Sequence, residues 1–416
     1  LEQAERLGYP VMLKATAGGG GRGIRRIVDP TDLPAAFTSA QSEARGAFGD
    51  ETLFVESMVS GARHIEVQII GDRAGVVWPV GVRDCTVQRR NQKIIEEAPS
   101  PVLTTEQDAY IKSAAARLGE AAGYEGAGTV EFLYDHATGE FYFMEVNARL
   151  QVEHPITEVT TGVDMVKLQL QVASGGLLEG EPPKTVGHAI EARINAEDPD
   201  RGFAPSPGRI DLLRFPGGPG TRVDSGVEEG DAVASEFDSM IAKVIATGSD
   251  REEAVGRLDR ALGQMRVVIR NGTTNKGFVR DLLDHPAYRS NDIDVGWVDR
   301  LDAIGASEAE TSAVALVAAS VTAYQEQLAI ELAAFKASAA AGRPEVGEQI
   351  GQEVQLRQGG HRYTLGVGEI DRNRFEVTLD GEAVEAHAEQ IDEFTMRLTC
   401  AGSSRQIISV VDGAVH

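Results

Sequence analysis

Polar and apolar residues alternate in two widely separated parts of this 416-residue chain. Between residues 53 and 80, and again between 354 and 411, apolar residues recur at every second position in short runs, which Gly, Asp or Asn interrupt. Because successive side chains of a strand point to opposite faces, these runs predict strands joined by tight turns. The second group predicts a small antiparallel barrel or sandwich.

The remaining segments alternate between helical and extended patterns, which indicates an α+β chain. Its length exceeds what one ordinary core holds, so two or three domains are expected. An alanine-rich helical pattern begins soon after residue 300. Helices are predicted at 1–7, 31–47, 104–122, 164–173, 251–267 and 308–341, and further strands at 11–15, 24–28, 128–133, 140–152, 188–195, 208–215 and 240–246.

One predicted strand has an unusual polar face. Polar and apolar residues alternate without a break from Glu145 to Glu153, so Glu145, Asn147, Arg149, Gln151 and Glu153 would project together. A solvated strand face more often carries Thr, Lys or Ser. Two carboxylates, amides and a guanidinium are the groups that hold a divalent metal and a small anion, so this strand is a candidate site.

Glu131 lies on the strand that is predicted to pair with this one, around a turn at 135–139. Such pairing would bring Glu131 and Glu145 together, with Asn147 beside them. Carboxylates and an amide oxygen are ligands that Mg²⁺ accepts while it holds ATP phosphates. Two buried acids repel one another, and a bound cation would explain why they lie together.

Three further motifs have both a functional and a structural interpretation. Lys14 precedes a glycine-rich stretch at 18–23, whose backbone could approach phosphates closely or could simply form a flexible hairpin tip. Gln88 and Lys93 bound a segment that could bind a nucleotide and an anion, or could be a solvated basic loop. Arg193 alternates with Glu191 on a predicted strand, where an internal ion pair is the simpler interpretation.

Composition narrows the class of protein. With 42% hydrophobic and 25% charged residues, the chain has the profile of a soluble globular protein. A formal charge of -24 makes nucleic acid an unsuitable partner, and no run approaches the ~18 apolar residues that a membrane span requires. Cys85 and Cys400 lack metal-type spacing, so a reducing, cytoplasmic setting is expected. Basic residues nevertheless gather locally, which favours a small anionic ligand: Arg83, Arg89, Arg90 and Lys93.

Taken in order, these motifs resemble those of the ATP-grasp biotin carboxylases over about residues 1–295. The resemblance implies a partial ATP-grasp lid at 1–58, and the ATP-grasp core with the biotin carboxylase C-terminal domain at 59–300. A long helix and a small antiparallel β-barrel, resembling an interaction domain, would occupy 301–416. The motifs are Lys14 with the 18–23 loop, Arg83-Asp84-Cys85, Gln88-Arg-Arg-Asn-Gln-Lys93, Glu131-Phe132, Glu145 to Pro155, Glu191 to Asp198, Pro205-Ser-Pro-Gly208, and Asp238-Ser-Met240 to Lys243.

The resemblance also implies roles for individual residues. Mg²⁺ or Mn²⁺ would be held by Glu131, Glu145 and Asn147. Bicarbonate would be bound by Lys93, Arg149, Gln151 and the backbone of Val152. Glu153 would be its general base, and Arg193 would stabilise the enolate-like form of biotin, so that Lys93, Arg149, Glu153 and Arg193 form the catalytic group. ATP would be bound by Lys14, Gly19, Gly20, Gly21, Glu56, Ser57, Met58, Val59, His64, Gln88, Asn91, Glu131 and Glu145.

The implied activity is ATP-dependent carboxylation of biotin by bicarbonate through carboxyphosphate, the first half-reaction of an acyl-CoA carboxylase. Implied partners are a biotin carboxyl carrier domain, a carboxyltransferase and further copies of the chain. The alternatives are another ATP-grasp ligase of the carbamoyl-phosphate type, or a non-catalytic scaffold of a multienzyme complex.

Three features depart from the family pattern. Asn91 stands where many members have His, and both can hydrogen-bond a ribose. The chain begins inside the lid, and it carries no Ala/Val-Met-Lys-Met biotinylation sequence, so we expect it to be an excerpt of a longer polypeptide.

Overall fold

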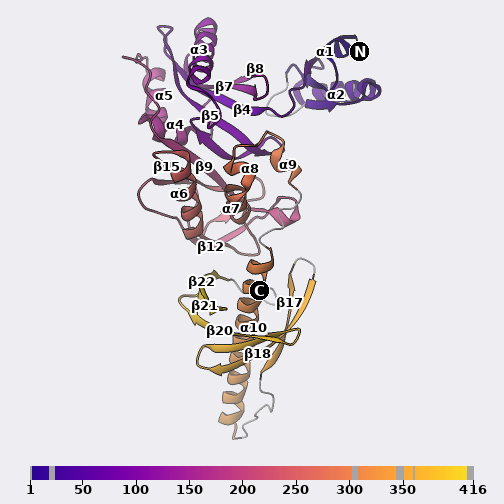
Figure 1. The fold of residues 1–416 in the computed structure, drawn as a ribbon, viewed down its shortest axis with the longest axis vertical. Helices are drawn as coiled ribbons and strands as arrows, with labels where there is room; N and C mark the ends of the chain where they lie inside the picture. The colour runs from indigo at the N-terminus through magenta and orange to yellow at the C-terminus, as the bar shows by residue number, and fades with distance from the viewer. Residues whose placement is uncertain (1, 18–23, 302–307, 343–350, 359–360, 410–416) are drawn as a thin grey trace.

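The computed structural model describes residues 2–17, 24–301, 308–342, 351–358 and 361–409. Figure 1 shows three groups of elements: a small N-terminal group at one side, a large central sheet with its helices, and a long helix with a second sheet at the far end. The predicted metal-binding and catalytic residues lie in the central group.

The N-terminal group is a three-stranded antiparallel sheet in the order β2-β1-β3, covered by helix. Its core contains Val11, Leu13, Ile27 and Leu33. The predicted pairing of the first two strands is confirmed, and the glycine loop between them lies outside the described residues. The elements are α1 (Glu2–Leu7), β1 (Val11–Ala15), β2 (Ile24–Ile27), η1 (Pro30–Asp32), α2 (Leu33–Phe48) and β3 (Leu53–Ser57).

The central sheet has eight strands in the order β13-β15-β9-β6-β5-β4-β7-β8, and every neighbouring pair is antiparallel. The strands are β4 (Arg63–Gly71), β5 (Val77–Arg89), β6 (Gln92–Ala98), β7 (Gly126–Asp135), β8 (Glu140–Asn147), β9 (His188–Asn195), β13 (Thr221–Ser225) and β15 (Met240–Gly248).

The longer helices that pack on this sheet are α3 (Thr105–Ala122), α4 (His154–Thr161), α5 (Met165–Ala173) and α6 (Arg251–Gln264). α3 lies on β4 and β5, where Ile111 packs with Ile65 and Val67. It begins with a capping box, because the Thr104 hydroxyl accepts from the Gln107 backbone while the Gln107 side chain accepts from the Thr104 backbone.

Short elements complete the central group beside and below β9 and β15 (Figure 1). A three-stranded sheet in the order β14-β12-β16 packs beside α6, and Tyr288 and Trp297 are buried in the same core as Leu258. The elements are β10 (Glu197–Asp198), η2 (Pro199–Arg201), β11 (Ala204–Pro205), β12 (Gly208–Arg214), β14 (Ala232–Val233), β16 (Arg266–Ile269), α7 (Lys276–Asp284), α8 (Pro286–Arg289) and α9 (Trp297–Arg300).

The C-terminal group consists of the predicted long helix, α10 (Glu308–Ala340), and a six-stranded antiparallel sheet. Val321 and Tyr324 of α10 pack against Leu365 and Phe375 of the sheet. The predicted barrel is not closed: within the described residues the strands pair in chain order, and the first does not pair with the last. They are β17 (Gln352–Gln358), β18 (His361–Asp371), β19 (Arg374–Leu379), β20 (Glu382–Gln390), β21 (Thr395–Cys400) and β22 (Ser403–Ile408).

Helix α10 also departs from the expectation that no segment is apolar enough to span a membrane. From Ala313 to Ala340 it meets the length and composition for such a span, with a mean hydropathy of 1.2. One third of its most apolar window is buried against the sheet, and core helices of soluble proteins meet the same criterion. The finding is therefore weak evidence for a membrane.

Two of the predicted ranges extend three or more residues beyond the end of the observed element. The strand predicted at 140–152 ends at Asn147, and α4 begins at His154. Pro155 explains the change, because it fixes φ and lacks a backbone donor, which suits the first turn of a helix. The helix predicted at 251–267 ends at Gln264, because Met265 is extended and leads into β16.

Candidate active site

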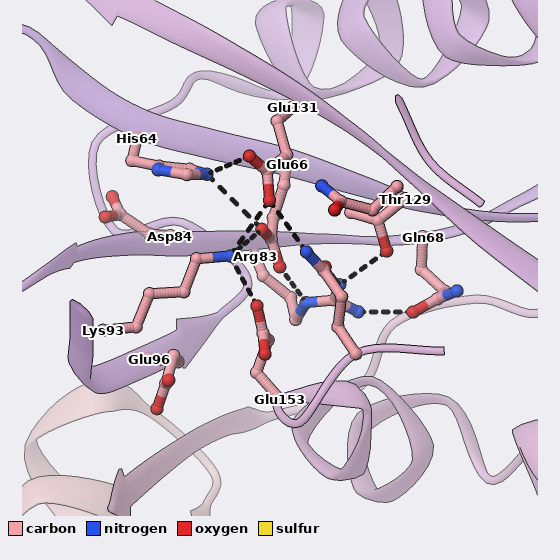
Figure 2. Close-up of polar contacts among 12 residues, drawn as sticks. His64, Glu66, Gln68, Arg83, Asp84, Lys93, Glu96, Thr129, Glu131 and Glu153 are labelled. Carbon is pink, nitrogen blue, oxygen red and sulfur yellow. Dashed lines mark hydrogen bonds and ion pairs between the residues drawn. The ribbon is translucent and has the colours of Figure 1, made fainter. Parts of the chain in front are cut away.

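Lys93 lies at the centre of a buried polar cluster between β4, β6, β7 and the start of α4 (Figure 2). Its Nζ atom donates to Glu66 Oε2 at 2.6 Å, to Glu131 Oε1 at 3.2 Å and to Glu153 Oε1 at 2.5 Å. Burial alone would lower the pKa of Lys93, but the charges of these carboxylates raise it well above its usual value. Lys93 is therefore a permanent cation that holds three acids together.

Arg83 supports the same acids from β5 and has none of its side chain exposed. Its Nε atom donates to Glu66 Oε1 at 2.5 Å. The guanidinium also donates to four polar side chains, those of Gln68 at 2.7 Å, Thr157 at 3.0 Å, Gln151 at 3.1 Å and Thr129 at 3.2 Å. Arg83 thereby fixes β4, β7 and α4 relative to one another.

Glu153 is buried at the N-terminal end of α4 and is held at both oxygens. Lys93 binds Oε1, and Arg193 Nη2 from β9 donates to Oε2 at 3.0 Å. Arg193 Nε donates to Glu96 Oε1 at 2.6 Å. The carbonyl of the preceding residue, Val152, accepts from Lys243 Nζ at 2.9 Å. The internal ion pair anticipated for Arg193 is present, and it includes the predicted base.

His64 faces the same acids from β4. Its Nε2 atom is 3.5 Å from Glu66 Oε2 and 3.5 Å from Glu131 Oε2, which is long for a hydrogen bond. Burial lowers the pKa of His64, but the interactions with Glu131 and Glu66 outweigh it and raise the pKa to about 9. We therefore treat these contacts as ion pairs of a protonated imidazole.

The predicted pairing of Glu131 with Glu145 is confirmed. They are directly opposite in the β7–β8 ladder, and Thr129 is opposite Asn147. Asn147 Nδ2 donates to Glu145 Oε1 at 3.4 Å. Two carboxylates and an amide oxygen at one end of a strand pair suit Mg²⁺ or Mn²⁺. Glu131 also forms another group of possible metal ligands with His64 and Glu66. One ligand atom from each of these residues lies within 4.8 Å of the other two.

Arg149 does not lie in the cluster. Because the strand ends at Asn147, Arg149 is exposed and its Nη1 atom donates to the Leu150 carbonyl at 3.3 Å. Gln151, by contrast, is buried, and its Nε2 atom donates to Glu131 Oε1 at 2.8 Å. The idea that all five polar residues from 145 to 153 share one strand face is therefore wrong, although a turn still brings Gln151 and Glu153 back to Glu131.

The predicted ATP residues fall into two groups. Lys14 pairs with Glu56 at 2.5 Å in the N-terminal sheet, and the next residues, 57–59, follow at the end of β3. Gln88 is buried on β5 opposite Lys93. Gly19, Gly20 and Gly21 lie outside the described residues.

Asn91 occupies a tight turn between β5 and β6. Arg90 has φ 48° and Asn91 has φ 65°, and the flanking Arg89 and Gln92 are paired. Asn tolerates this left-handed conformation better than most residues, which gives it a structural reason to stand here.

Several cluster residues were not among the predicted site residues. They are Glu66, Gln68, Arg83, Glu96, Thr129 and Thr157. The sequence of β4 could have indicated Glu66 and Gln68, because they alternate with His64 on one face of that strand. The other contacts depend on which strands become neighbours, which alternation does not reveal.

Comparisons with known proteins agree with this geometry. Residues 1–180 match the family described as the carbamoyl-phosphate synthase L chain, ATP binding domain, and residues 191–300 match the biotin carboxylase C-terminal domain. The chain is 45% identical over 304 residues to a biotin carboxylase from Nostoc sp., which covers 73% of this chain and 67% of that protein. This chain belongs to the biotin carboxylase family.

Solved structures of other family members superimpose on this chain. A biotin carboxylase from Campylobacter jejuni, in a β,γ-ATP complex, gives a TM-score of 0.69 at 42% identity, over 71% of this chain and 66% of that one. The biotin carboxylase domain of a 2-oxoglutarate carboxylase from Hydrogenobacter thermophilus, in complex with MgADP, ADP and bicarbonate, gives 0.69 at 41% identity, over 72% and 66%.

A pyruvate carboxylase component from Methanothermobacter thermautotrophicus is 48% identical over 298 residues, which is 71% of this chain and 60% of that protein. The family thus includes parts of carboxylases with different final substrates. This chain spans 60–67% of the length of these two curated relatives.

Proposed function

We propose that this chain catalyses the ATP-dependent carboxylation of biotin by bicarbonate, through carboxyphosphate, as the first half-reaction of an acyl-CoA carboxylase. The observation that carries the proposal is the double hold on Glu153, by Lys93 at 2.5 Å and by Arg193 at 3.0 Å. A buried carboxylate kept in place between two cations is suited to accept a proton from a small oxyanion bound there. The solved relative described with MgADP and bicarbonate supports the same substrates.

In this proposal Glu153 removes the proton of bicarbonate while a bicarbonate oxygen attacks the γ-phosphorus of ATP, and ADP leaves. Lys93, Gln151 and the backbone of Val152 border the place of the bicarbonate. Arg149 is exposed in this structure, so its guanidinium would turn toward Lys93 when bicarbonate binds. Glu131, Glu145 and Asn147 would hold Mg²⁺ or Mn²⁺, which supplies charge that neutralises the phosphates.

The second step uses Arg193. Carboxyphosphate breaks down to CO₂ and phosphate, the phosphate takes the N1 proton of biotin, and N1 attacks CO₂ to give carboxybiotin. The guanidinium of Arg193, held by Glu96 and Glu153, would stabilise the oxyanion that forms on the ureido group. Carboxyphosphate hydrolyses easily, so water must be excluded while it exists.

We assign the exclusion of water to closure of the N-terminal group, residues 1–58, over the phosphates. Lys14 and Gly19, Gly20 and Gly21 would contact the phosphates, and residues 56–59 would border the adenine together with His64, Gln88 and Asn91. Separate hydrophobic clusters support the division at residues 58 and 300, since Leu13, Leu258 and Phe375 each belong to a different one.

We further propose a cytoplasmic, homo-oligomeric complex in which a biotin carboxyl carrier domain and a carboxyltransferase meet this chain. The group formed by α10 and its sheet, residues 301–416, would be the part that docks the carboxyltransferase. Its independent core supports such a role, and the exposed Leu328, Ile330 and Leu332 on α10 offer apolar contact area.

The test is ADP release by the full-length protein, with and without bicarbonate and free biotin. We expect ADP release to require bicarbonate and to increase with biotin. Glu153→Gln keeps the size of the side chain but removes the base, so kcat should fall at least about a hundredfold. Glu389→Gln is the matched control, because Glu389 is exposed on β20 and pairs with Arg397 at 2.7 Å.

Unchanged turnover in Glu153→Gln would contradict the role of Glu153. Bicarbonate-dependent ADP release that biotin leaves unchanged would favour a ligase of the carbamoyl-phosphate type. A protein that fails to bind Mg-ATP would instead be a scaffold.

A further inference from the structure

Behind Arg193 lies a buried acid that the proposed reaction does not use. Glu191 is on β9, two residues before Arg193, and none of it is exposed. Both of its carboxyl oxygens are buried without a hydrogen-bond partner among the described residues. An ionised carboxylate without a donor costs several kcal/mol to bury, so this arrangement requires an explanation.

The residue directly opposite Glu191 on β6 is Glu96. Side chains of directly opposed residues start about 4.5–5.5 Å apart at Cβ, so two long carboxyl groups reach one another. Glu96 is also fully buried, and only Oε1 is occupied, by Arg193 Nε at 2.6 Å. Oε2 of Glu96 has no partner within the described part of the chain. Glu96 and Glu191, each with at least one buried carboxyl oxygen that lacks a hydrogen-bond partner, therefore lie opposite each other on β6 and β9.

The cations around Glu191 already bind other groups. Arg193 binds Glu96 and Glu153, and Lys243 on β15 donates to the Val152 carbonyl and lies 3.5 Å from Asp224. On the remaining side, Ile156 of α4 and Ile245 of β15 belong to an apolar cluster with Ala189. Within the described part of the chain no donor is hydrogen-bonded to Glu191, and only the charges of Lys243 and Arg193 favour its ionised form.

We propose that Glu191 is a neutral carboxylic acid that donates a hydrogen bond to Glu96 Oε2, and that it acts as a positioning residue for Arg193. The proton satisfies both acids at once: Glu96 stays an anion for Arg193, and Glu191 fixes its second oxygen. Burial, and then the charge of Glu96, raise the pKa of Glu191 well above its usual value, while Lys243 and Arg193 act in the opposite direction and Glu153 adds to the rise.

The consequence for the reaction rests on the function proposed above. Glu191 is fully buried and lies opposite Glu96, so it would act only through the angle at which Glu96 holds the Arg193 guanidinium. That guanidinium would meet biotin, not ATP. Losing the Glu191 donor should therefore raise KM for free biotin and lower biotin-dependent kcat, while KM for ATP stays near its original value. Bicarbonate-dependent ADP release without biotin should fall less than the biotin-dependent rate, because Lys93 still holds Glu153 when Arg193 is misplaced.

The matched pair of variants is Glu191→Gln and Glu191→Met, in the full-length protein. Gln resembles the protonated acid and keeps an N–H donor for Glu96, so kcat/KM for biotin should stay within about threefold, whereas Met has similar length without the donor and should lose about tenfold or more. The kcat/KM pH profile of Glu191→Gln should follow that of the original protein. A loss of about tenfold or more in kcat/KM for biotin in Glu191→Gln would overturn the proposal, because it would mean that the ionised form of Glu191 is needed.

Infrared difference spectroscopy tests the proton directly and needs no turnover. The original protein minus Glu191→Gln should show the C=O stretch of a protonated carboxyl group at pH 7 and at pH 8. Absence of that band would overturn the inference even if biotin carboxylation were confirmed. A protein that shows the band but does not carboxylate biotin would contradict the proposed function and leave the neutral Glu191 in place. Equal values of kcat/KM for biotin in Glu191→Gln and Glu191→Met would overturn the positioning role of Glu191.

Discussion

At the scale of single residues, Arg83 illustrates how one buried cation organises the site. It holds Glu66 directly and reaches Gln151, which in turn holds Glu131. Burial and the charges of Arg83 and Lys93 act in opposite directions on Glu66, and the charges prevail, so the pKa of Glu66 lies well below its usual range. Glu66 is thus held as an anion by two fixed cations.

We expect Arg83→Met to destabilise the protein strongly, because it leaves the Glu66 carboxylate buried with one partner fewer. Breaking a buried ion pair by removing one partner costs about 3–5 kcal/mol in the free energy of unfolding. Urea unfolding followed by circular dichroism measures this. Arg397→Met removes an exposed pair and should cost at most about 1 kcal/mol. Equal effects of the two substitutions would contradict this account of Arg83.

At the scale of elements, Glu97 ties β6 to β9 and α6. Its carboxylate accepts from His188 Nε2 at 3.0 Å and from Arg251 at 2.7 and 2.9 Å. Burial raises the pKa of Glu97, but the bonds from His188 and Arg251 outweigh it and hold the pKa well below its ordinary value of 4.5. The three elements are therefore joined by an ionised carboxylate.

This depressed pKa predicts an acid-dependent loss of stability. The contribution of Glu97 is fully present above pH 4.5, its unfolded pKa, and is lost as the pH falls toward the folded pKa. Glu97→Gln should be less stable than the original protein by about 3–5 kcal/mol at pH 7. Urea unfolding at pH 7, 5 and 3.5 should show this gap narrowing below pH 4.5. A gap that stays constant with pH would refute the linkage.

Sequence patterns were sufficient for elements whose contacts are local. The β7–β8 pair follows from alternation around one turn, and with it the placement of Glu131 opposite Glu145. Alternation did not reveal that the strand stops at Asn147, because irregular chain can carry the same pattern. Pro155 was the one available signal for the helix that follows.

The remainder of the site depends on strand order. β6 lies between β5 and β9, and this placement brings Lys93 and Glu96 to Glu153 and Arg193 although about a hundred residues separate β6 from β9. No spacing in the chain encodes that neighbourhood. The family resemblance assigned roles to Lys93, Glu153 and Arg193. It assigned none to Glu96, or to Glu191 at the start of a family motif, which the structure places beside them.

At the scale of the whole molecule, the central and C-terminal groups have separate cores. Leu258 lies in the first and Phe375 in the second. Between the two groups, Arg266 donates to Thr395 at 3.3 Å and to Gln406 at 2.9 Å. Contacts of this kind hold an orientation but do not merge two cores.

We therefore expect separate calorimetric transitions for the central and C-terminal groups, each sensitive to a different substitution. Phe375→Ala should lower the stability of the C-terminal group by about 3–5 kcal/mol, and Leu258→Ala that of the central group by about 2–5 kcal/mol. Differential scanning calorimetry should show each variant shifting one transition and leaving the other in place. If either substitution moves both transitions together, the two groups unfold as one unit.

The strand orders of the two large sheets also imply different folding speeds. In the C-terminal sheet every strand pairs with its neighbour in the chain, from β17 to β22, so most contacts join nearby residues. In the central sheet β4 pairs with β7, and β6 with β9, across long loops that must close first. Because local contacts form faster than distant ones, β17 to β22 should be among the first strands to reach their native shape, although the ribosome releases them after the central sheet.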